Sequence, residues 1–343
     1  MHEARFWEPA AEGKVRCGLC RFRCLIAQGQ RGVCGVRENR DGTLYTLVYG
    51  KSVAEAVDPV EKKPLYHYHP GSRTFSIATV GCNFRCLHCQ NHQISQWPRS
   101  GKALPGHDLP PTQVVAEAQR RGCGSISYTY TEPTIFFEYA YDTAILARKA
   151  GLGNIFVTNG FITPEALAEI APYLDAANVD LKGFSERFYR EVAGATLNGV
   201  LDALRDYRRH GIWLEVTTLV IPGYNDSAAE LRDMARFITS ELGCDTPWHL
   251  SAFHPTYRLL DQPPTPAKTL LMARRIGLEA GLHYVYLGNL STGEGEDTLC
   301  PGCGQAVISR RGVWLQGMAL REGNCGYCGH AIAGVGLGGS SPG

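Results

Sequence analysis

The chain has 343 residues, 44% of them hydrophobic and 20% charged, and its formal net charge is +1 at pH 7. Such a chain can bury one substantial core with small appendages, and its near-neutral charge gives no strong signal for nucleic acid or an anionic membrane. No apolar run reaches about 18 residues and the first residues lack the apolar stretch of a signal peptide, so we expect a cytoplasmic protein without a transmembrane helix.

Eleven of the 13 cysteines fall in three clusters. With no export signal, such clusters are typical of metal sites in a reducing compartment rather than of disulfides. The first cluster lies in a Cys-rich N-terminal segment, residues 1–70, and consists of Cys17, Cys20, Cys24 and Cys34. Its spacing differs from the bacterial ferredoxin pattern, so structural zinc, a second iron–sulfur cluster and other arrangements all stay open.

A charged run from Asp58 to Lys63 closes the N-terminal segment and mixes both charge signs. We interpret it as a solvated turn held by Pro59 and Pro64. The alternative is a role in docking a partner or gating a substrate.

Residues 71–290 alternate short apolar runs with helical patterns. The predicted strands are Thr74–Val80, Ser125–Thr129, Asn154–Thr158, Ala177–Leu181, Trp213–Val220, His249–Phe253 and Tyr284–Leu287. The predicted helices are Pro111–Arg121, Thr134–Ala150, one that begins at Thr163-Pro164, Leu197–Arg209, Ser227–Leu242 and Pro266–Ala280. This alternation predicts an α/β fold with parallel strands, and about six repeats favour a partial (β/α)6 barrel of the TIM type over an open doubly wound sheet.

The second cysteine cluster, Cys82, Cys86 and Cys89, follows the first predicted strand of this body. Three thiolates from one loop can hold three corners of a cubane [4Fe–4S] cluster and leave one iron open to another ligand. A chance cluster, or a zinc site without its fourth ligand, is the alternative.

Further polar residues stand where other strands of the body end, which is where barrel enzymes carry their functional groups. They are Glu132 after the second strand, Asn159 after the third, Asp180 and Lys182 at the end of the fourth, and His254 after the sixth. Each has a plainer explanation: a helix-terminal carboxylate for Glu132, a turn at Asn159, an ion pair between Asp180 and Lys182, and a surface loop around His254.

The third cluster, Cys300, Cys303, Cys325 and Cys328, forms two CxxC pairs in glycine-rich turns. This pattern predicts a zinc-ribbon-like module over residues 291–333 with one tetrahedral zinc, and a rubredoxin-type single iron is the rival. Residues 334–343 are rich in Gly and Ser and are predicted to be a disordered tail. The two cysteines outside the clusters, Cys123 and Cys244, are expected to be plain buried thiols.

The run from Gly81 to Asn91 resembles the signature of the radical S-adenosylmethionine (SAM) superfamily. That resemblance implies that SAM chelates the open iron of the cluster and is cleaved to methionine and a 5′-deoxyadenosyl radical. His88 stands where the superfamily carries a residue whose surroundings touch the adenine. Tyr130-Thr131-Glu132-Pro133-Thr134 stands where the superfamily has its Gly-Gly-Glu segment, which meets the SAM amino group. The glycines are absent here, so the resemblance implies this contact for Glu132 alone.

Other segments resemble the pyruvate-formate-lyase-activase-like branch of the superfamily. Val157-Thr158-Asn159-Gly160 is similar to its Asp-Thr-Asn-Gly segment, with Val157 in place of the Asp. Val179-Asp180-Leu181-Lys182 resembles its Asp-Leu-Lys strand, so Lys182 is implied to contact the SAM carboxylate. Phe253-His254-Pro255 resembles a further segment, which implies that His254 faces the ribose or the radical. The resemblance also implies that Asn159 lies near the ribose.

Two longer strings, Asp58–Gly71 and Thr129–Phe136, together with the flanking cysteine modules, resemble the radical SAM proteins of the AmmeMemoRadiSam system. That likeness implies Memo-type and AMME-candidate-type companion proteins, and an electron donor of the flavodoxin or ferredoxin type.

The sequence therefore predicts a radical SAM enzyme in which Cys82, Cys86, Cys89 and His254 are catalytic and His88, Glu132, Asn159, Asp180 and Lys182 bind the cofactor. A glycyl-radical-enzyme activase acting on a protein glycine is the alternative within the enzyme class. A non-catalytic metal-binding scaffold is the alternative outside it.

Overall fold

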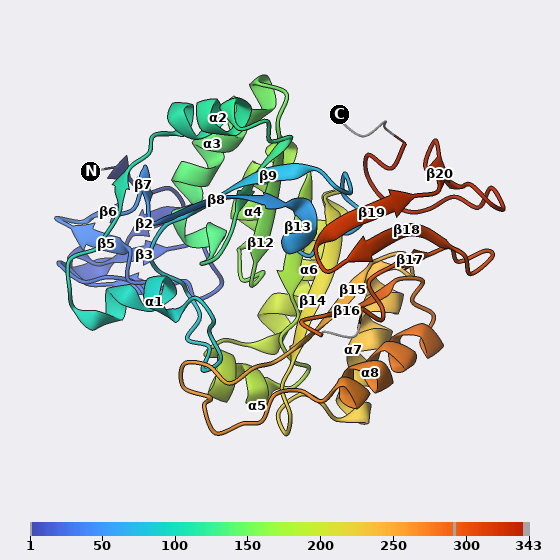
Figure 1. Ribbon diagram of the computed structural model, residues 1–343. Coiled ribbons are helices and arrows are strands. Elements are labelled where there is room, and N and C mark those ends of the chain that lie inside the picture. Colours follow the sequence, from blue (N-terminus) through green and yellow to red (C-terminus); the bar gives the residue numbers. More distant parts are fainter. Residues whose placement is uncertain (1, 291–292, 339–343) are drawn as a thin grey trace. The chain divides into compact units, whose positions relative to one another are not determined.

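The computed structural model describes residues 2–290 and 293–338 (Figure 1). Its residues group into two compact units between which the chain passes several times. The first unit comprises Met1–Asp58, Thr74–Ala177 and Asn198–Ile212, and the second comprises Pro59–Arg73, Asn178–Leu197 and Trp213–Gly343.

Parallel strands form the centre of the first unit. β11 (Ser125–Tyr128) pairs in parallel with β9 (Arg73–Ala78) on one side and with β12 (Gly153–Thr158) on the other. β8 (Ala54–Pro59) lies beyond β9. All four residues of β11 are buried, as expected of a parallel strand with both faces covered.

Helices α2 (Pro111–Arg120) and α3 (Phe137–Lys149) pack on each other and against β11 (Figure 1). α2 begins with proline in its first turn, where the missing N–H costs nothing, and buries Val114, Val115 and Ala118 on one face. α4 (Pro164–Ile170) and α6 (Leu197–Arg209) complete the main helices of this unit.

Small antiparallel sheets make up the N-terminal segment. One has the order β1 (His2–Glu3), β6 (Thr43–Thr46), β5 (Arg37–Arg40), and another the order β2 (Trp7–Pro9), β3 (Val15–Cys17), β4 (Leu25–Ile26). A further pair joins β7 (Lys51–Ser52) to β10 (His107–Asp108).

The second unit continues the parallel pattern. β13 (Ala176–Asp180) carries the chain into this unit, and β14 (Trp213–Val220), β15 (Trp248–Ala252) and β16 (Val285–Gly288) pair in parallel in that order. α8 (Ala267–Glu279) packs against β15, β16 and α7 (Ala228–Phe237). α5 (Glu186–Phe188) leads into a π-helical turn, Tyr189–Ala193.

The C-terminal module of this unit is an antiparallel sheet of β17 (Thr298–Leu299), β18 (Ala306–Arg311) and β19 (Trp314–Met318), followed by the pair β20 (Leu320–Arg321) and β21 (Asn324–Cys325). Its buried cysteines, Cys300 and Cys325, share a core with Tyr66, Tyr284 and Tyr286. The module therefore has little core of its own and depends on the rest of the unit.

The predicted strands and helices of the body are confirmed, with most ends within one or two residues and α6 and β14 at the predicted bounds. Thr163 is the residue before α4, as expected. No closed barrel is formed by the described strands: the parallel strands of each unit form an open sheet, beside the small antiparallel sheets. No helix in the described part of the chain combines the length and the apolarity needed to cross a membrane.

Two expectations from composition are corrected in described residues. The charged run Asp58–Lys63 is not a solvated turn, because Asp58, Glu61 and Lys63 are each less than 5% exposed. Part of the predicted disordered tail is bonded: the N–H of Val335 donates to the His67 carbonyl at 2.7 Å, and Leu337 is buried. Residues 339–343 of that stretch lie outside the described part.

Candidate functional site

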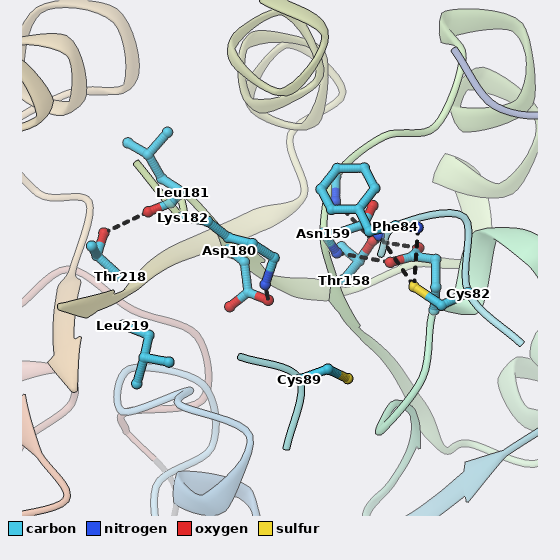
Figure 2. Close-up of polar contacts among 12 residues, drawn as sticks. Cys82, Phe84, Cys89, Thr158, Asn159, Asp180, Leu181, Lys182, Thr218 and Leu219 are labelled. Atoms are coloured by element: carbon cyan, nitrogen blue, oxygen red, sulfur yellow. Dashed lines mark hydrogen bonds and ion pairs between the residues drawn. The ribbon is translucent and has the colours of Figure 1, made fainter. Parts of the chain in front are cut away.

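The loop between β9 and α1 (His92–Ser95) carries Cys82, Cys86 and Cys89. The Cys82 Sγ accepts the backbone N–H of Phe84 at 3.4 Å and lies 3.8 Å from the side-chain nitrogen of Asn159 (Figure 2). The Cys89 Sγ lies 3.1 Å from the Ser95 hydroxyl oxygen. Donors around a thiol stabilise its thiolate form, which is the form that binds metal.

The other two cysteines of this loop influence the pKa of Cys82. Burial raises the pKa of Cys82 well above its ordinary value, and the charges of Glu132, Cys86 and Cys89 raise it further. A positive centre bound to all three would reverse this cost, because a coordinating thiol is deprotonated. The loop therefore fits the [4Fe–4S] cluster that its spacing predicts.

Gly81 fixes the entry to this loop. Its φ is +102°, and a Cβ at this position would lie 2.8 Å from Val36 Cγ1 and 3.0 Å from the carbonyl oxygen of Cys34. Any side chain at residue 81 would be strained and crowded, so the loop depends on glycine here.

Asn159 joins the end of β12 to the cysteine loop. Its side-chain N–H donates to Oδ1 of Asn83 at 2.7 Å, and its own Oδ1 accepts the N–H of Phe161 at 3.0 Å. The structure thus brings Asn159 to Cys82 and Asn83, and its predicted place near the ribose stays a prediction. Asn83 is fully buried between Cys82 and Cys86 in the chain. The sequence analysis missed it, although its place between two clustered cysteines was visible there.

Glu132 is fully buried, and its carboxylate is saturated. Oε1 accepts the Thr134 N–H at 3.0 Å, the Thr134 hydroxyl at 2.6 Å and the Thr158 hydroxyl at 2.7 Å, and Oε2 accepts the Asn159 N–H at 2.8 Å. Burial raises the pKa of this carboxyl, and the Thr134 and Asn159 donors oppose the rise. This arrangement favours a helix-capping and positioning role, since Glu132 is the N-cap residue directly before η4 (Pro133–Phe136). The predicted contact with the SAM amino group stays a prediction.

Tyr130 has a left-handed backbone, with φ at +63°, at the start of the segment that resembles Gly-Gly-Glu. A bulky residue seldom adopts this conformation. Two bonds hold it: its hydroxyl donates to Asp58 at 2.7 Å, and its carbonyl accepts the side-chain N–H of Asn91 at 2.7 Å. These two bonds stabilise a left-handed tyrosine at this position, and Asn91 ties it to the cysteine loop.

Lys182 and Asp180, in the second unit, form an ion pair with an Nζ to Oδ2 distance of 2.6 Å (Figure 2). The backbone around Lys182 is fixed by Asn225, whose side-chain N–H donates to the Lys182 carbonyl at 2.7 Å. His254 is exposed just after β15, and His88 is buried in the cysteine loop. The ion pair is the plainer of the two roles predicted for Asp180 and Lys182, and a carboxylate ligand would compete with it for the ammonium.

The four C-terminal cysteines form a preorganised site. Their Sγ atoms all lie within 4.8 Å of one another, with Cys300 to Cys328 at 3.6 Å and Cys303 to Cys325 at 3.7 Å. Although burial opposes it, the N–H groups of Cys328 and Tyr327 lower the pKa of Cys325 to about 7. Four thiols at these separations fit one tetrahedral ion, since metal–sulfur bonds of about 2.3 Å place the sulfurs about 3.8 Å apart.

The remaining cysteines lie in two different settings. Cys123 is buried, as expected, but Cys244 is partly exposed. Cys244 also lies with Asp245 and His283 in a group whose possible ligand atoms are within 4.8 Å of one another. No spacing pattern in the sequence pointed to this group, because 38 residues separate Asp245 from His283.

An open α/β fold and a three-cysteine loop at a strand end define a class of cluster-dependent enzymes. Residues 76–238 match the family model of the radical SAM superfamily. A relative, the uncharacterized protein MJ0808 of Methanocaldococcus jannaschii, is 46% identical over 334 residues, which cover 97% of this chain and 99% of that protein. The chain belongs to the radical SAM superfamily.

More distant relatives agree with this assignment. The pyruvate formate-lyase-activating enzyme of Clostridium pasteurianum is 23% identical over 49% of this chain and 70% of its own length. Among solved structures, a radical SAM methyltransferase from Sphaerobacter thermophilus has a TM-score of 0.51 at 16% identity, covering 65% of this chain and 68% of that one. This second likeness concerns the fold alone.

Proposed function

We propose that the protein is a radical SAM enzyme whose [4Fe–4S] cluster is held by Cys82, Cys86 and Cys89. When bound, the reduced cluster and SAM supply a 5′-deoxyadenosyl radical that abstracts hydrogen from a substrate. The observation that carries the proposal is the loop itself, in which the Phe84 N–H and the Asn159 side-chain nitrogen lie against the Cys82 sulfur and the Ser95 hydroxyl lies against the Cys89 sulfur.

The chain's own residues would orient the components. Asn159 holds the Cys82 sulfur and Asn83, and Glu132 holds the end of β12 that carries Asn159. Lys182 would exchange its partner Asp180 for the SAM carboxylate, and His88 and His254 would lie near the adenine and the ribose, as the resemblance implies. A one-electron donor of the flavodoxin or ferredoxin class would reduce the cluster.

Release of 5′-deoxyadenosine tests this function. Anaerobically reconstituted and reduced protein given SAM should release it, as measured by chromatography, and the Cys82→Ala variant should not. The Cys123→Ala variant, which alters a buried thiol outside the clusters, is the matched control and should retain release. Equal release by the Cys82→Ala variant would refute the cluster assignment.

For the C-terminal module, we propose a single zinc ion. The 3.6 and 3.7 Å sulfur separations support one tetrahedral ion, and a module with little core of its own gains folding free energy from such a site. Metal analysis of the Cys303→Ser variant should show one zinc fewer per chain than the parent protein. Loss of iron instead would favour a rubredoxin-type centre.

We also propose that the protein acts with Memo-type and AMME-candidate-type companions, on the strength of the strings Asp58–Gly71 and Thr129–Phe136. Addition of both companions should change the amount of 5′-deoxyadenosine formed per SAM consumed. Identical kinetics with and without them would contradict this partnership.

A further inference from the structure

The N-terminal cysteines are gathered by the fold of the first unit. Cys17 ends β3, and its N–H donates to the Cys24 carbonyl at 2.9 Å. The N–H of Arg23 donates to the Cys20 carbonyl at 3.0 Å and closes a tight turn, in which Arg23 has a φ of +42°. Cys17, Cys20 and Cys34 are 6%, 9% and 8% exposed, so most of this cluster is sheltered from solvent.

Backbone N–H groups surround the sulfurs of this cluster. The N–H of Phe22 points at the Cys20 sulfur and the N–H of Val36 at the Cys34 sulfur. The Cys24 sulfur lies 3.6 Å from the Cβ position of Gly32, so glycine leaves room for it there. Backbone N–H groups that point at sulfur are the usual surroundings of metal-bound thiolates.

Arg37 supplies a buried positive charge beside these thiols. Its side chain bonds Glu138 at 2.9 and 3.1 Å and the Arg5 carbonyl at 2.6 Å, but its Nε, buried as well, has no hydrogen-bond partner. Burial lowers the pKa of Arg37, but the charges of Glu138, Cys17 and Cys34 outweigh it and raise the pKa overall. An unused cationic donor next to buried thiols points to an anionic centre, such as a metal bound by four thiolates.

This cysteine group touches the loop of Cys82. The Cys34 carbonyl lies 3.0 Å from the Cβ position of Gly81, the residue before Cys82. One Nη of Arg99 donates to both the Val33 carbonyl at 3.0 Å and the Cys82 carbonyl at 3.3 Å. The two cysteine groups are therefore joined through one guanidinium and one backbone contact.

The N-terminal segment is also anchored without a metal. Arg21 pairs with Asp206 at 2.8 Å, the Thr163 hydroxyl donates to the Gly18 carbonyl at 2.8 Å, and Cys20 forms a β-bridge with Ile162. Structural zinc is most needed where a small module lacks such contacts. These contacts leave little need for a purely structural zinc. A redox-active centre, by contrast, requires a position that is sheltered from solvent and close to the Cys82 loop.

We propose that Cys17, Cys20, Cys24 and Cys34 hold a second [4Fe–4S] cluster that passes electrons to the cluster on Cys82, Cys86 and Cys89. A protein donor of the flavodoxin or ferredoxin class gives one electron and takes the second cluster from the 2+ to the 1+ state. That electron then reduces the SAM cluster from 2+ to 1+, and the second cluster returns to 2+. No bond is made or broken in the relay. The relay rests on the proposed function, but the presence of the second cluster does not depend on it.

Metal analysis tests the cluster without any radical chemistry. The triple variant Cys82→Ala, Cys86→Ala, Cys89→Ala, reconstituted anaerobically with iron and sulfide, should keep about four iron and four sulfide per chain and an EPR signal after reduction. Adding Cys17→Ala and Cys20→Ala should remove them. Two zinc ions per chain in a triple variant without an iron–sulfur cluster, or four iron and four sulfide that survive the five substitutions, would overturn the proposal, whatever the outcome of the 5′-deoxyadenosine assay.

The relay is tested by changing the electron donor. The Cys34→Ser variant should form 5′-deoxyadenosine about tenfold or more slowly with reduced flavodoxin, but at the parent rate with Ti(III) citrate, which can reduce the SAM cluster directly. If circular dichroism shows that the Cys34→Ser variant does not fold, the Cys24→Ser variant is used in its place, because Cys24 is the least buried of the four cysteines. Cys123→Ala is the control, and an equal loss with both reductants would overturn the relay.

Discussion

Asn159 is the side chain that contacts the proposed cluster loop most directly from another strand end. It contacts the Cys82 sulfur and Asn83 from a strand end that Glu132 holds in place. Hydrogen bonds to sulfur raise the reduction potential of an iron–sulfur cluster because they stabilise the more negative reduced state. In the proposed enzyme, Asn159 would therefore act on the cluster through the Cys82 sulfur, in addition to any contact with SAM.

The Asn159→Ala variant should have a SAM cluster with a reduction potential about 40 mV more negative, because a hydrogen bond contributes about 1 kcal/mol and 59 mV corresponds to a factor of ten for one electron. An EPR-monitored redox titration measures this shift. Asn198→Ala, at an exposed position of α6, is the control. An unchanged potential in the Asn159→Ala variant would show that its side chain does not influence the sulfur.

His67 makes part of the stability of the second unit depend on pH. Its Nδ1 lies 2.6 Å from the Ala333 carbonyl and its Nε2 lies 2.6 Å from the Tyr286 hydroxyl, so the buried ring is neutral with its proton on Nδ1. Burial lowers its pKa from 6.5 to about 4. Between these two values the unfolded chain binds more protons than the folded one, so stability is present above pH 6.5 and is lost as pH falls toward 4.

From this difference we expect the free energy of unfolding of the parent protein to fall by about 2 kcal/mol through His67 when the pH is lowered from 7 to 5. Urea unfolding at both pH values measures the loss, which should be smaller by that amount in the His67→Asn variant. His69→Asn, at an exposed neighbouring position, should keep the parent's pH dependence. An equal loss in parent and His67→Asn protein would contradict the assignment.

At the scale of elements, β18 is joined to η2 (Val60–Lys62) by a buried ion pair. Arg310 and Glu61 have fully buried side chains, with Nε and Oε1 3.7 Å apart. Arg310 also donates to the Tyr66 carbonyl at 2.6 Å and to the Thr298 hydroxyl at 2.9 Å. The charged string that the sequence suggested was solvated is thus the attachment point of the C-terminal module.

The Arg310→Met variant should lose about 3–5 kcal/mol of unfolding free energy, because it leaves Glu61 buried without its counter-charge. The double variant Arg310→Met, Glu61→Gln should recover part of the loss. Urea unfolding of all four members of this mutant cycle measures the coupling. Arg311→Met, exposed on the same strand, should be nearly neutral, and full additivity of the two substitutions would refute the pairing.

For the whole molecule, local sequence patterns predicted the elements better than the contacts between distant residues. Buried strands such as β11 and helix starts such as Pro111 and Thr163 carry local signals, and these were found. The bond between Asn159 and Asn83 spans 76 residues, and no local pattern encodes it. The saturation of Glu132 also depends on Thr158, 26 residues away, so a motif alone could not separate capping from cofactor binding.

The C-terminal module should not be separable, although the sequence suggested a distinct domain over residues 291–333. A chain that ends at residue 290 loses Arg310 and Thr298, and exposes Tyr66, Tyr284 and Tyr286 of the shared core. We expect it to lose cooperative unfolding of the second unit, as followed by hydrogen exchange, and to aggregate. A stable truncated protein with parent-like exchange in β14–β16 would contradict this.

The contacts of Glu215 can form only late in the synthesis of the chain. Its two carboxylate oxygens accept the backbone N–H groups of Tyr66 and His67, 149 and 148 residues earlier in the chain, and the Nε2 of His249 lies 2.6 Å from Oε2. On the ribosome, the segment Pro59–Arg73 therefore leaves the exit tunnel long before its acceptor does. A chaperone that shields this segment during synthesis should increase the yield of folded protein, and a slowly translated stretch before residue 215 should lower it.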